Sequence, residues 1–135
     1  MAEEIRVLVV EPLEKPRLVT MEHTLKNLQE LAGGTIQAVY PWPEDRVALL
    51  CDDEGKFKGY PPNRMLVGED GEPYDILVGR FFLTGLSEDN FASISDELAE
   101  KYTELFYWPE MFTRTMDGHV MWLKIKPGEE PKVIV

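Results

Sequence analysis

The chain has 135 residues and a mass of 15.5 kDa, which is enough for one domain with a single hydrophobic core. Apolar residues make up 44% of it, so the composition excludes a wholly disordered protein. The net charge of -11 argues against direct partners such as nucleic acid or an anionic membrane, because phosphate groups repel such a protein.

The first half of the chain predicts strands and one helix. Leucines recur at three-residue steps over residues 24–32, which predicts an amphipathic helix that starts near Thr20 or Thr24. The pair Gly33 and Gly34 ends this pattern. Short apolar runs predict strands over 5–10, 17–20, 35–40 and 47–51.

The second half predicts further strands, a helix and a terminal hairpin. Residues 61–64 read as a rigid polar surface loop. The other predicted elements are a strand over 76–84, a helix over 95–107 capped by Ser93 or Ser95, a hairpin of 111–116 and 119–126, and an edge strand at 133–135. The two predicted helices do not alternate strictly with the strands, and this order predicts an α+β fold with a mostly antiparallel sheet. We expect one domain over 1–135, with a β-hairpin and tail at 110–135.

Positive and aromatic side chains are interleaved in the segment 51–83 of this acidic protein. They are Lys56, Lys58, Arg64 and Arg80, beside Phe57, Tyr60, Phe81 and Phe82. Rings stack on bases while cations meet phosphates, so the pattern predicts a pocket for a flat anionic ligand. Arg80 has a second interpretation, in which it pairs with an acid such as Asp75 or Asp89.

No catalytic signature accompanies these residues. Neither His23 nor His119 has the spacing of a zinc site, and the glycine motifs of nucleophile elbows and phosphate loops are missing. The acidic turns at 52–54 and 69–72 lack the spacing of a calcium loop. We therefore expect a binding protein that is not an enzyme and that uses no metal or cofactor.

The sequence also predicts where the protein works. Its single cysteine, Cys51, excludes an internal disulfide framework. The run over 5–10 is too short for a secretory signal, and no apolar stretch approaches the roughly 20 residues that cross a bilayer. We expect a cytoplasmic protein.

Several short motifs in a fixed order carry a family resemblance. They lie at 7–12, 25–31, 33–34, 54–56, 59–64, 74–76, 79–82 and 89–93. On these motifs, residues 5 to about 105 resemble a family of small acidic proteins of unknown function found in phages, plasmids and conjugative elements. The resemblance implies a mobile element, whose small proteins often disarm host defences, and it carries no catalytic residues over.

Two functional hypotheses fit this resemblance. In the first, the chain is similar to phage sponge proteins that sequester nucleotide immune signals, such as those of Thoeris defence. The ligand-binding residues would then be Lys56, Lys58, Asn63, Arg64, Arg80, Phe82, Asn90 and Arg114. Because sponges need closed pockets, which subunit interfaces commonly supply, we expect a homo-oligomer.

In the second hypothesis, the acidic surface imitates DNA and occupies a basic host defence protein, as antirestriction proteins do. The acidic runs at 52–54, 69–72, 88–89 and 96–104 would present the charge. An accessory role of unknown kind is the third alternative.

Overall fold

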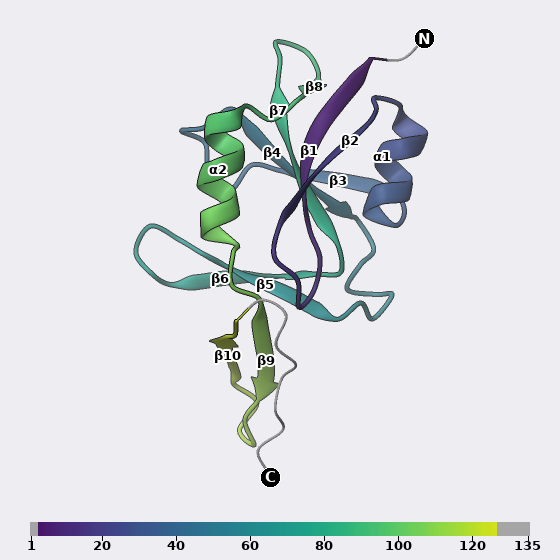
Figure 1. The fold of residues 1–135 in the computed structure, drawn as a ribbon. Helices are drawn as coiled ribbons and strands as arrows, with labels where there is room; N and C mark the ends of the chain where they lie inside the picture. The colour runs from purple at the N-terminus through teal and green to yellow at the C-terminus, as the bar shows by residue number, and fades with distance from the viewer. Residues whose placement is uncertain (1–2, 127–135) are drawn as a thin grey trace.

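The computed structural model describes residues 3–126, and within them it has two helices and ten strands (Figure 1). The helices are α1 (Leu25–Ala32) and α2 (Asp96–Leu105). The strands are β1 (Glu4–Val10), β2 (Arg17–Glu22), β3 (Ile36–Val39), β4 (Val47–Asp52), β5 (Pro62–Val67), β6 (Pro73–Val78), β7 (Phe81–Leu86), β8 (Phe91–Ala92), β9 (Glu110–Arg114) and β10 (Val120–Lys124). The predicted α+β fold with mostly antiparallel sheets is confirmed.

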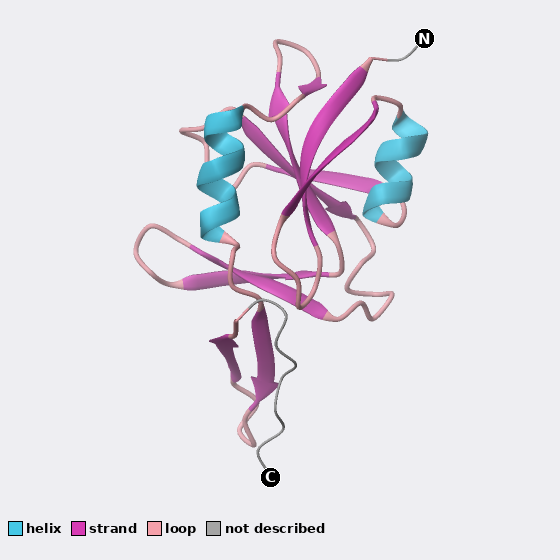
Figure 2. Cartoon of the chain, in the orientation of Figure 1, coloured by secondary structure: helices cyan, strands magenta, loops and turns pink. Residues whose placement is uncertain are grey.

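The main sheet lies between the two helices, as Figure 2 shows. Its strand order is β2-β1-β7-β4-β3, β8 pairs with β7, and every pairing is antiparallel. Side chains alternate along β1, so that Val7 and Val9 pack with α1 while Leu8 and Val10 pack with α2. Because both faces are covered, the central strands are continuous apolar runs without polar alternation.

Capping side chains fix where both helices begin. The Thr24 hydroxyl accepts a hydrogen bond from the Asn27 N–H at 3.1 Å, and the Ser95 hydroxyl accepts one from the Leu98 N–H at 3.2 Å. Gly33 ends α1 with a φ of 99°, as its position predicted. Helix α2 ends at Leu105, two residues earlier than predicted, and the guanidinium of Arg64 donates to the carbonyl of the next residue.

The predicted strand over 76–84 is wrong, because the chain breaks at Gly79, whose φ is 68°. Residues before the break belong to β6, which pairs with β5, and residues after it belong to β7 of the main sheet. A side chain at Gly79 would meet the ring of Tyr60, so glycine also permits this close packing. The predicted surface loop at 61–64 is wrong as well: Asn63 and Arg64 lie in β5 and are 0% exposed.

The C-terminal part of the described chain is a hairpin of β9 and β10. Its turn contains Asp117 and Gly118, as predicted, and Gly118 has a φ of 90°. Strand β9 packs beside β5, so the hairpin joins the domain through the β5–β6 pair. The edge strand predicted at 133–135 lies outside the described residues. Within residues 3–126, no helix has both the length and the apolar character needed to cross a bilayer.

Candidate functional site

Phe82 belongs to the hydrophobic core. It is 0% exposed and packs with Leu28 and Ala32 of α1. Phe81 points to the other face, where its ring centroid lies 5.3 Å from that of Phe106. Both rings are buried because β7 is a central strand of a sheet covered on both sides. The prediction that Phe82 holds a ligand base is therefore wrong.

Arg64 and Asn63 form a buried network that links several segments. Arg64 donates to the Phe106 carbonyl at 2.9 and 3.3 Å, to the Glu14 carbonyl at 2.6 Å, and to the Asn63 side-chain oxygen at 2.7 Å. The Asn63 amide nitrogen donates to the carbonyls of Val10, at the end of β1, and Gly79, in the break between β6 and β7. Neither side chain reaches solvent, so the prediction that they contact a ligand directly is wrong.

Lys56 and Lys58 are exposed but paired with acids. The Lys56 amine lies 2.6 Å from Asp75, and the Lys58 amine lies 2.6 Å from the buried Asp52. Burial raises the pKa of Asp52, but hydrogen bonds from Lys58, the Glu54 N–H and Tyr60 lower that pKa by more. The hollow of about 260 Å³ beside Lys56 is also lined by three carboxylates, of Asp52, Asp53 and Asp75. It is unsuited to an anion.

The remaining predicted residues are scattered over the surface. The Arg80 guanidinium lies 3.1 Å from Glu11, so it pairs with an acid, though with neither of the acids predicted. Asn90 lies in the exposed turn before β8 and accepts the Phe91 N–H at 2.8 Å. Arg114 is exposed at the end of β9. The eight predicted side chains do not converge on one pocket.

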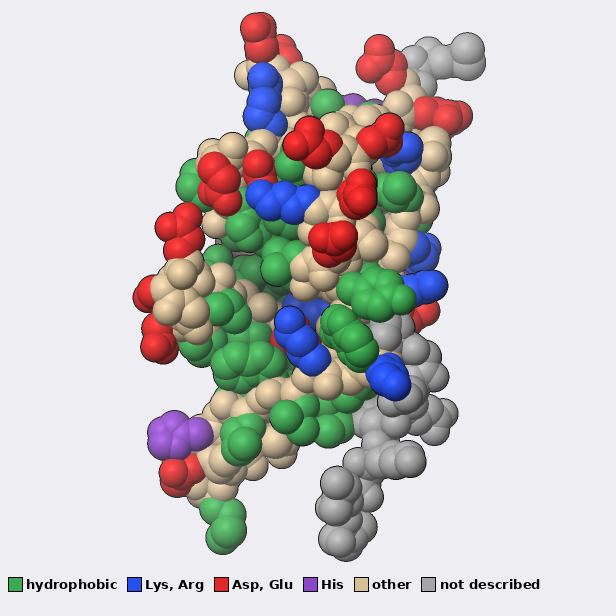
Figure 3. All heavy atoms as spheres, turned by 60° about the vertical axis from the view of Figure 1, so that its left-hand side comes forward, with side chains coloured by type: hydrophobic (Ala, Val, Ile, Leu, Met, Phe, Trp, Pro, Cys, Tyr) green, Lys and Arg blue, Asp and Glu red, His purple; other side chains and the backbone are tan. Residues whose placement is uncertain are grey.

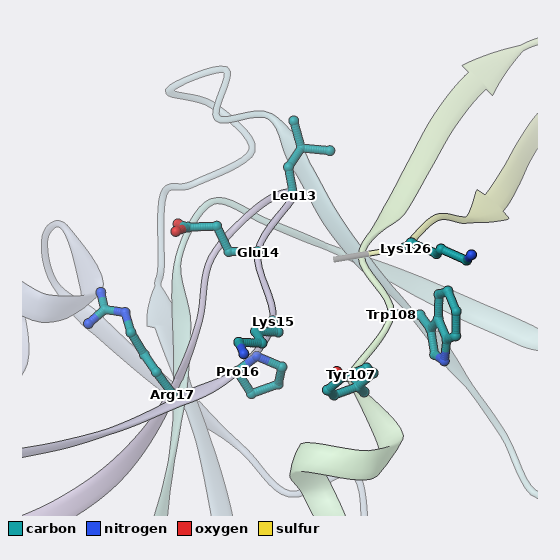
Figure 4. A pocket seen from close by; sticks show the side chains of 8 residues that line it. All are labelled: Leu13, Glu14, Lys15, Pro16, Arg17, Tyr107, Trp108 and Lys126. Carbon is teal, nitrogen blue, oxygen red and sulfur yellow. The ribbon is translucent and has the colours of Figure 1, made fainter. Parts of the chain in front are cut away.

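A different pocket forms between the β1–β2 loop and the segment after α2 (Figure 4). Its volume is about 760 Å³, within the range of small-molecule sites. One wall is the β1–β2 loop with Arg17, the first residue of β2, and the other is Tyr107 and Trp108 with Lys126 above them in the view of Figure 4. We call it the loop–helix pocket; its lining residues are Leu13, Glu14, Lys15, Pro16, Arg17, Tyr107, Trp108 and Lys126.

The loop–helix pocket combines positive charge with exposed aromatic rings. Three cations and a single carboxylate line it, in a protein whose net charge is -11. Tyr107 and Trp108 are 41% and 40% exposed, and their ring centroids lie 6.2 Å apart with an interplanar angle of 79°. This is the chemistry that the sequence predicted for a ligand site, but other residues supply it.

Two arginines near this pocket pair with the same carboxylate, that of Glu11. Glu11 lies 2.6 Å from Arg17 and 3.1 Å from Arg80. The hydrogen bond from Arg17, aided by Arg80, lowers the pKa of Glu11 against the effect of burial. Within residues 3–126, Lys15 and Lys126 make no ion pair.

Leu13 holds an unusual backbone conformation at the rim of the pocket. Its φ is 65°, in the left-handed region that favours glycine. Pro12 precedes it, and the Glu14 N–H donates to the Glu11 carbonyl at 3.2 Å, which is the arrangement of a tight turn. The Leu13 side chain is nevertheless 43% exposed. The chain therefore carries an exposed apolar side chain where glycine would be less strained, as occurs at functional sites.

Arg64 connects the two walls from below. Its guanidinium binds the carbonyl of Glu14 on one wall and that of Phe106, next to Tyr107, on the other. Burial lowers the pKa of Arg64 to about 10, while Glu110 acts in the opposite direction, so the group stays charged at neutral pH. Arg64 thus positions the pocket and adds positive potential beneath it without touching a ligand.

Sequence reasoning missed this pocket because its parts come from distant segments. The detectable signals were the aromatic pair before Pro109 and the cations around Pro16.

Comparison with known proteins identifies one matching family model, a domain of unknown function (DUF3846), over residues 5–107. No curated protein and no solved structure matches the chain. The matched segment contains the loop wall and Tyr107, whereas Trp108 and Lys126 lie beyond it.

Proposed function

Because the chain belongs to DUF3846, a family of domains of unknown function, we propose its function from the chemistry of the loop–helix pocket. The protein binds a flat anionic ligand of the nucleotide class and does not convert it. In this proposal the protein sequesters its ligand. A counter-defence protein of a phage or other mobile element would sequester a nucleotide immune signal in the same way.

One observation carries this proposal: cations and exposed rings share a cavity in a strongly acidic protein. Tyr107 and Trp108 offer two ring surfaces nearly at right angles, so a planar base can stack on one and contact the edge of the other. Lys15 and Lys126 bring ammonium groups for phosphate oxygens. A local positive field attracts an anion even though the whole protein is negative.

The lining residues support binding without turnover. Among the described residues, the lining includes no serine, cysteine or histidine. The cationic side chains of the lining can bind anionic groups of a ligand, and the rings of Tyr107 and Trp108 can stack on its base.

The proposal is tested by asking what the purified protein carries and what it binds. We expect heat denaturation to release an intact nucleotide-like compound, identified by mass spectrometry. Calorimetry with a panel of AMP, NAD and a cyclic dinucleotide should find a member that binds. If nothing is released and no member of the panel binds, the proposal is wrong.

Matched variants locate the binding in the pocket. Trp108→Ala and Lys15→Gln should each weaken binding about tenfold or more, because they remove a stacking surface and a phosphate contact. Lys26→Gln is the control: Lys26 is also exposed but lies on α1, across the sheet from α2. Equal affinities for Lys15→Gln and Lys26→Gln would exclude the loop–helix pocket.

A second candidate, the acidic inhibitor of a basic protein, is favoured by the surface of α2. Carboxylates gather over this helix in Figure 3, and four of its acids are exposed: Asp96, Glu97, Glu100 and Glu104. Asp52 does not contribute, because it is buried and bonded to Lys58. A complex with a basic protein should weaken as salt rises, and replacing the four acids by amides should abolish it.

A further inference from the structure

A further cavity lies beside α2. Its volume is about 260 Å³, and Figure 3 shows apolar side chains gathering in a hollow next to this helix. The lining comes from the β3–β4 loop, β5, the end of α2 with the residue after it, and the β9–β10 hairpin: Trp42, Met65, Leu66, Val67, Leu105, Phe106, Glu110, Trp122 and Lys124. We call it the tryptophan cavity. It shares no lining residue with the loop–helix pocket.

Glu110 is the unusual member of this lining, because it is a carboxylate that is 6% exposed among apolar side chains. One of its oxygens accepts the Met65 N–H at 3.0 Å. The other, Oε2, has no hydrogen-bond partner within residues 3–126. A buried carboxylate with an unpaired oxygen attracts a hydrogen-bond donor that carries positive charge.

The neighbouring cations leave this carboxylate without a direct partner. Lys124 stands opposite Glu110 in the β9–β10 register, but within the described residues the two form no ion pair. Arg64 acts on Glu110 only through space, since its donors are used on backbone and amide oxygens. Burial raises the pKa of Glu110 against the hydrogen bond from the Met65 N–H and the charges of Arg64 and Lys124.

The aromatic side chains complete the chemistry of a cation site. Trp42, in the β3–β4 loop, and Trp122, in β10, both line the cavity. Trp42 packs against Phe106 with ring centroids 5.8 Å apart. Indole faces attract ammonium and guanidinium groups, most strongly where water is excluded. A cavity of this volume is below the usual range for whole small molecules and suits one side chain.

We propose that the tryptophan cavity receives a lysine or arginine side chain of a basic partner protein, whose charged head meets Glu110 Oε2 between the indole rings. Charge complementarity supports this occupant: the net charge is -11, and exposed Glu104 lies on α2 next to the lining residue Leu105. The proposal stands independently of the nucleotide-class ligand, because a different cavity carries it.

The test uses the indole N–H signals of the three tryptophans in a 15N-labelled sample. Butylammonium and propylguanidinium serve as probes, and 1-pentanol is the uncharged control of similar length. We expect at least one cation to shift the Trp42 and Trp122 signals saturably and at least tenfold more tightly than 1-pentanol, with Trp108 unchanged. Equal affinity for cation and alcohol, or no shift from either cation, overturns the proposal.

Two substitutions with opposite effects sharpen the test. Glu110→Gln keeps an oxygen for the Met65 N–H and should weaken cation binding at least tenfold, whereas Lys124→Met removes a competing charge and should tighten it severalfold. Glu30→Gln, at an exposed position on α1, is the control for general charge and should change affinity less than twofold. Unchanged affinity in both Glu110→Gln and Lys124→Met overturns the assignment; if Glu110→Gln fails to fold, Lys124→Met decides alone.

A capped peptide, acetyl-Ala-Ala-Lys-Ala-Ala-amide, distinguishes a protein side chain from a free amine. It should shift the same two indole signals and compete with butylammonium. If butylammonium binds and the peptide does not, the assignment to a partner's side chain is wrong.

Discussion

Among the buried polar side chains, we expect removal of the Arg64 guanidinium to cause the largest loss of unfolding free energy. In Arg64→Ala, the Phe106 carbonyl, the Glu14 carbonyl and the Asn63 side-chain oxygen each lose their donor. An unsatisfied buried acceptor costs about 1–3 kcal/mol, and the hydrogen bond from Arg64 to the Glu14 carbonyl is only partly buried. Removal of the cationic charge from burial offsets part of this loss. We expect a net loss of about 3–5 kcal/mol, a large part of the roughly 5–15 kcal/mol of a typical domain.

The assay is urea unfolding followed by circular dichroism at pH 7. For a urea dependence of about 1–3 kcal/mol per molar, a loss of this size lowers the midpoint by roughly 2 M. Arg64→Lys keeps the charge but cannot form the fork between the two walls, so it should weaken ligand binding at the loop–helix pocket as well. The control is Arg114→Ala, at an exposed position, with an expected change within about 0.5 kcal/mol. A loss below about 1 kcal/mol in Arg64→Ala would refute the reasoning.

Three further substitutions test other parts of the structure. Leu13→Gly should stabilise the fold by about 0.5–1 kcal/mol, because glycine accepts the positive φ, and it should also weaken ligand binding. Urea unfolding measures the first effect and calorimetry on the same sample measures the second. A destabilised variant would contradict the strain argument. Asp52 has a lowered pKa, so its stabilisation is present above its ordinary pKa of 3.8 and is lost as pH falls through the folded value. Asp52→Asn should therefore flatten the fall in urea midpoint on the acid side, and an unchanged slope would count against the Lys58–Asp52–Tyr60 cluster. Gly85→Ala should lower the free energy of unfolding by about 1–3 kcal/mol, because the new methyl group would collide with the Ser93 backbone carbonyl. The control is Gly59→Ala, whose methyl group meets no atom within 4 Å, so that only its positive φ destabilises the variant. Equal losses in the two variants would contradict the packing around Gly85.

Local signals in the sequence predicted much of the fold. Thr24, Ser95 and Gly33 mark helix ends by short-range hydrogen bonds and backbone conformation, which depend on neighbours in the chain. The apolar runs of β1 and β4 were equally visible. The break at Gly79 was not, because it depends on the packing of Tyr60 against a glycine nineteen positions away, and an apolar run alone does not reveal such a turn.

The ligand site depended on tertiary structure, and there the sequence prediction failed. Phe82 and Arg64 have the chemistry of a nucleotide site, but their exposure is decided by a sheet covered on both faces and by carbonyls that the fold brings together. Conversely, Lys15 and Trp108 become neighbours only because the β1–β2 loop and the end of α2 meet. No spacing rule connects residues separated by about ninety positions.

The distribution of the three tryptophans allows one measurement to test the central claim that a nucleotide-class anion binds between the β1–β2 loop and the end of α2. Trp108 lines that pocket, while Trp42 and Trp122 line the other cavity. Titration of 15N-labelled protein with the tightest-binding nucleotide of the panel should move the Trp108 indole signal saturably and leave the other two in place. A nucleotide that moves Trp42 or Trp122 instead, or that binds without moving Trp108, would contradict the account.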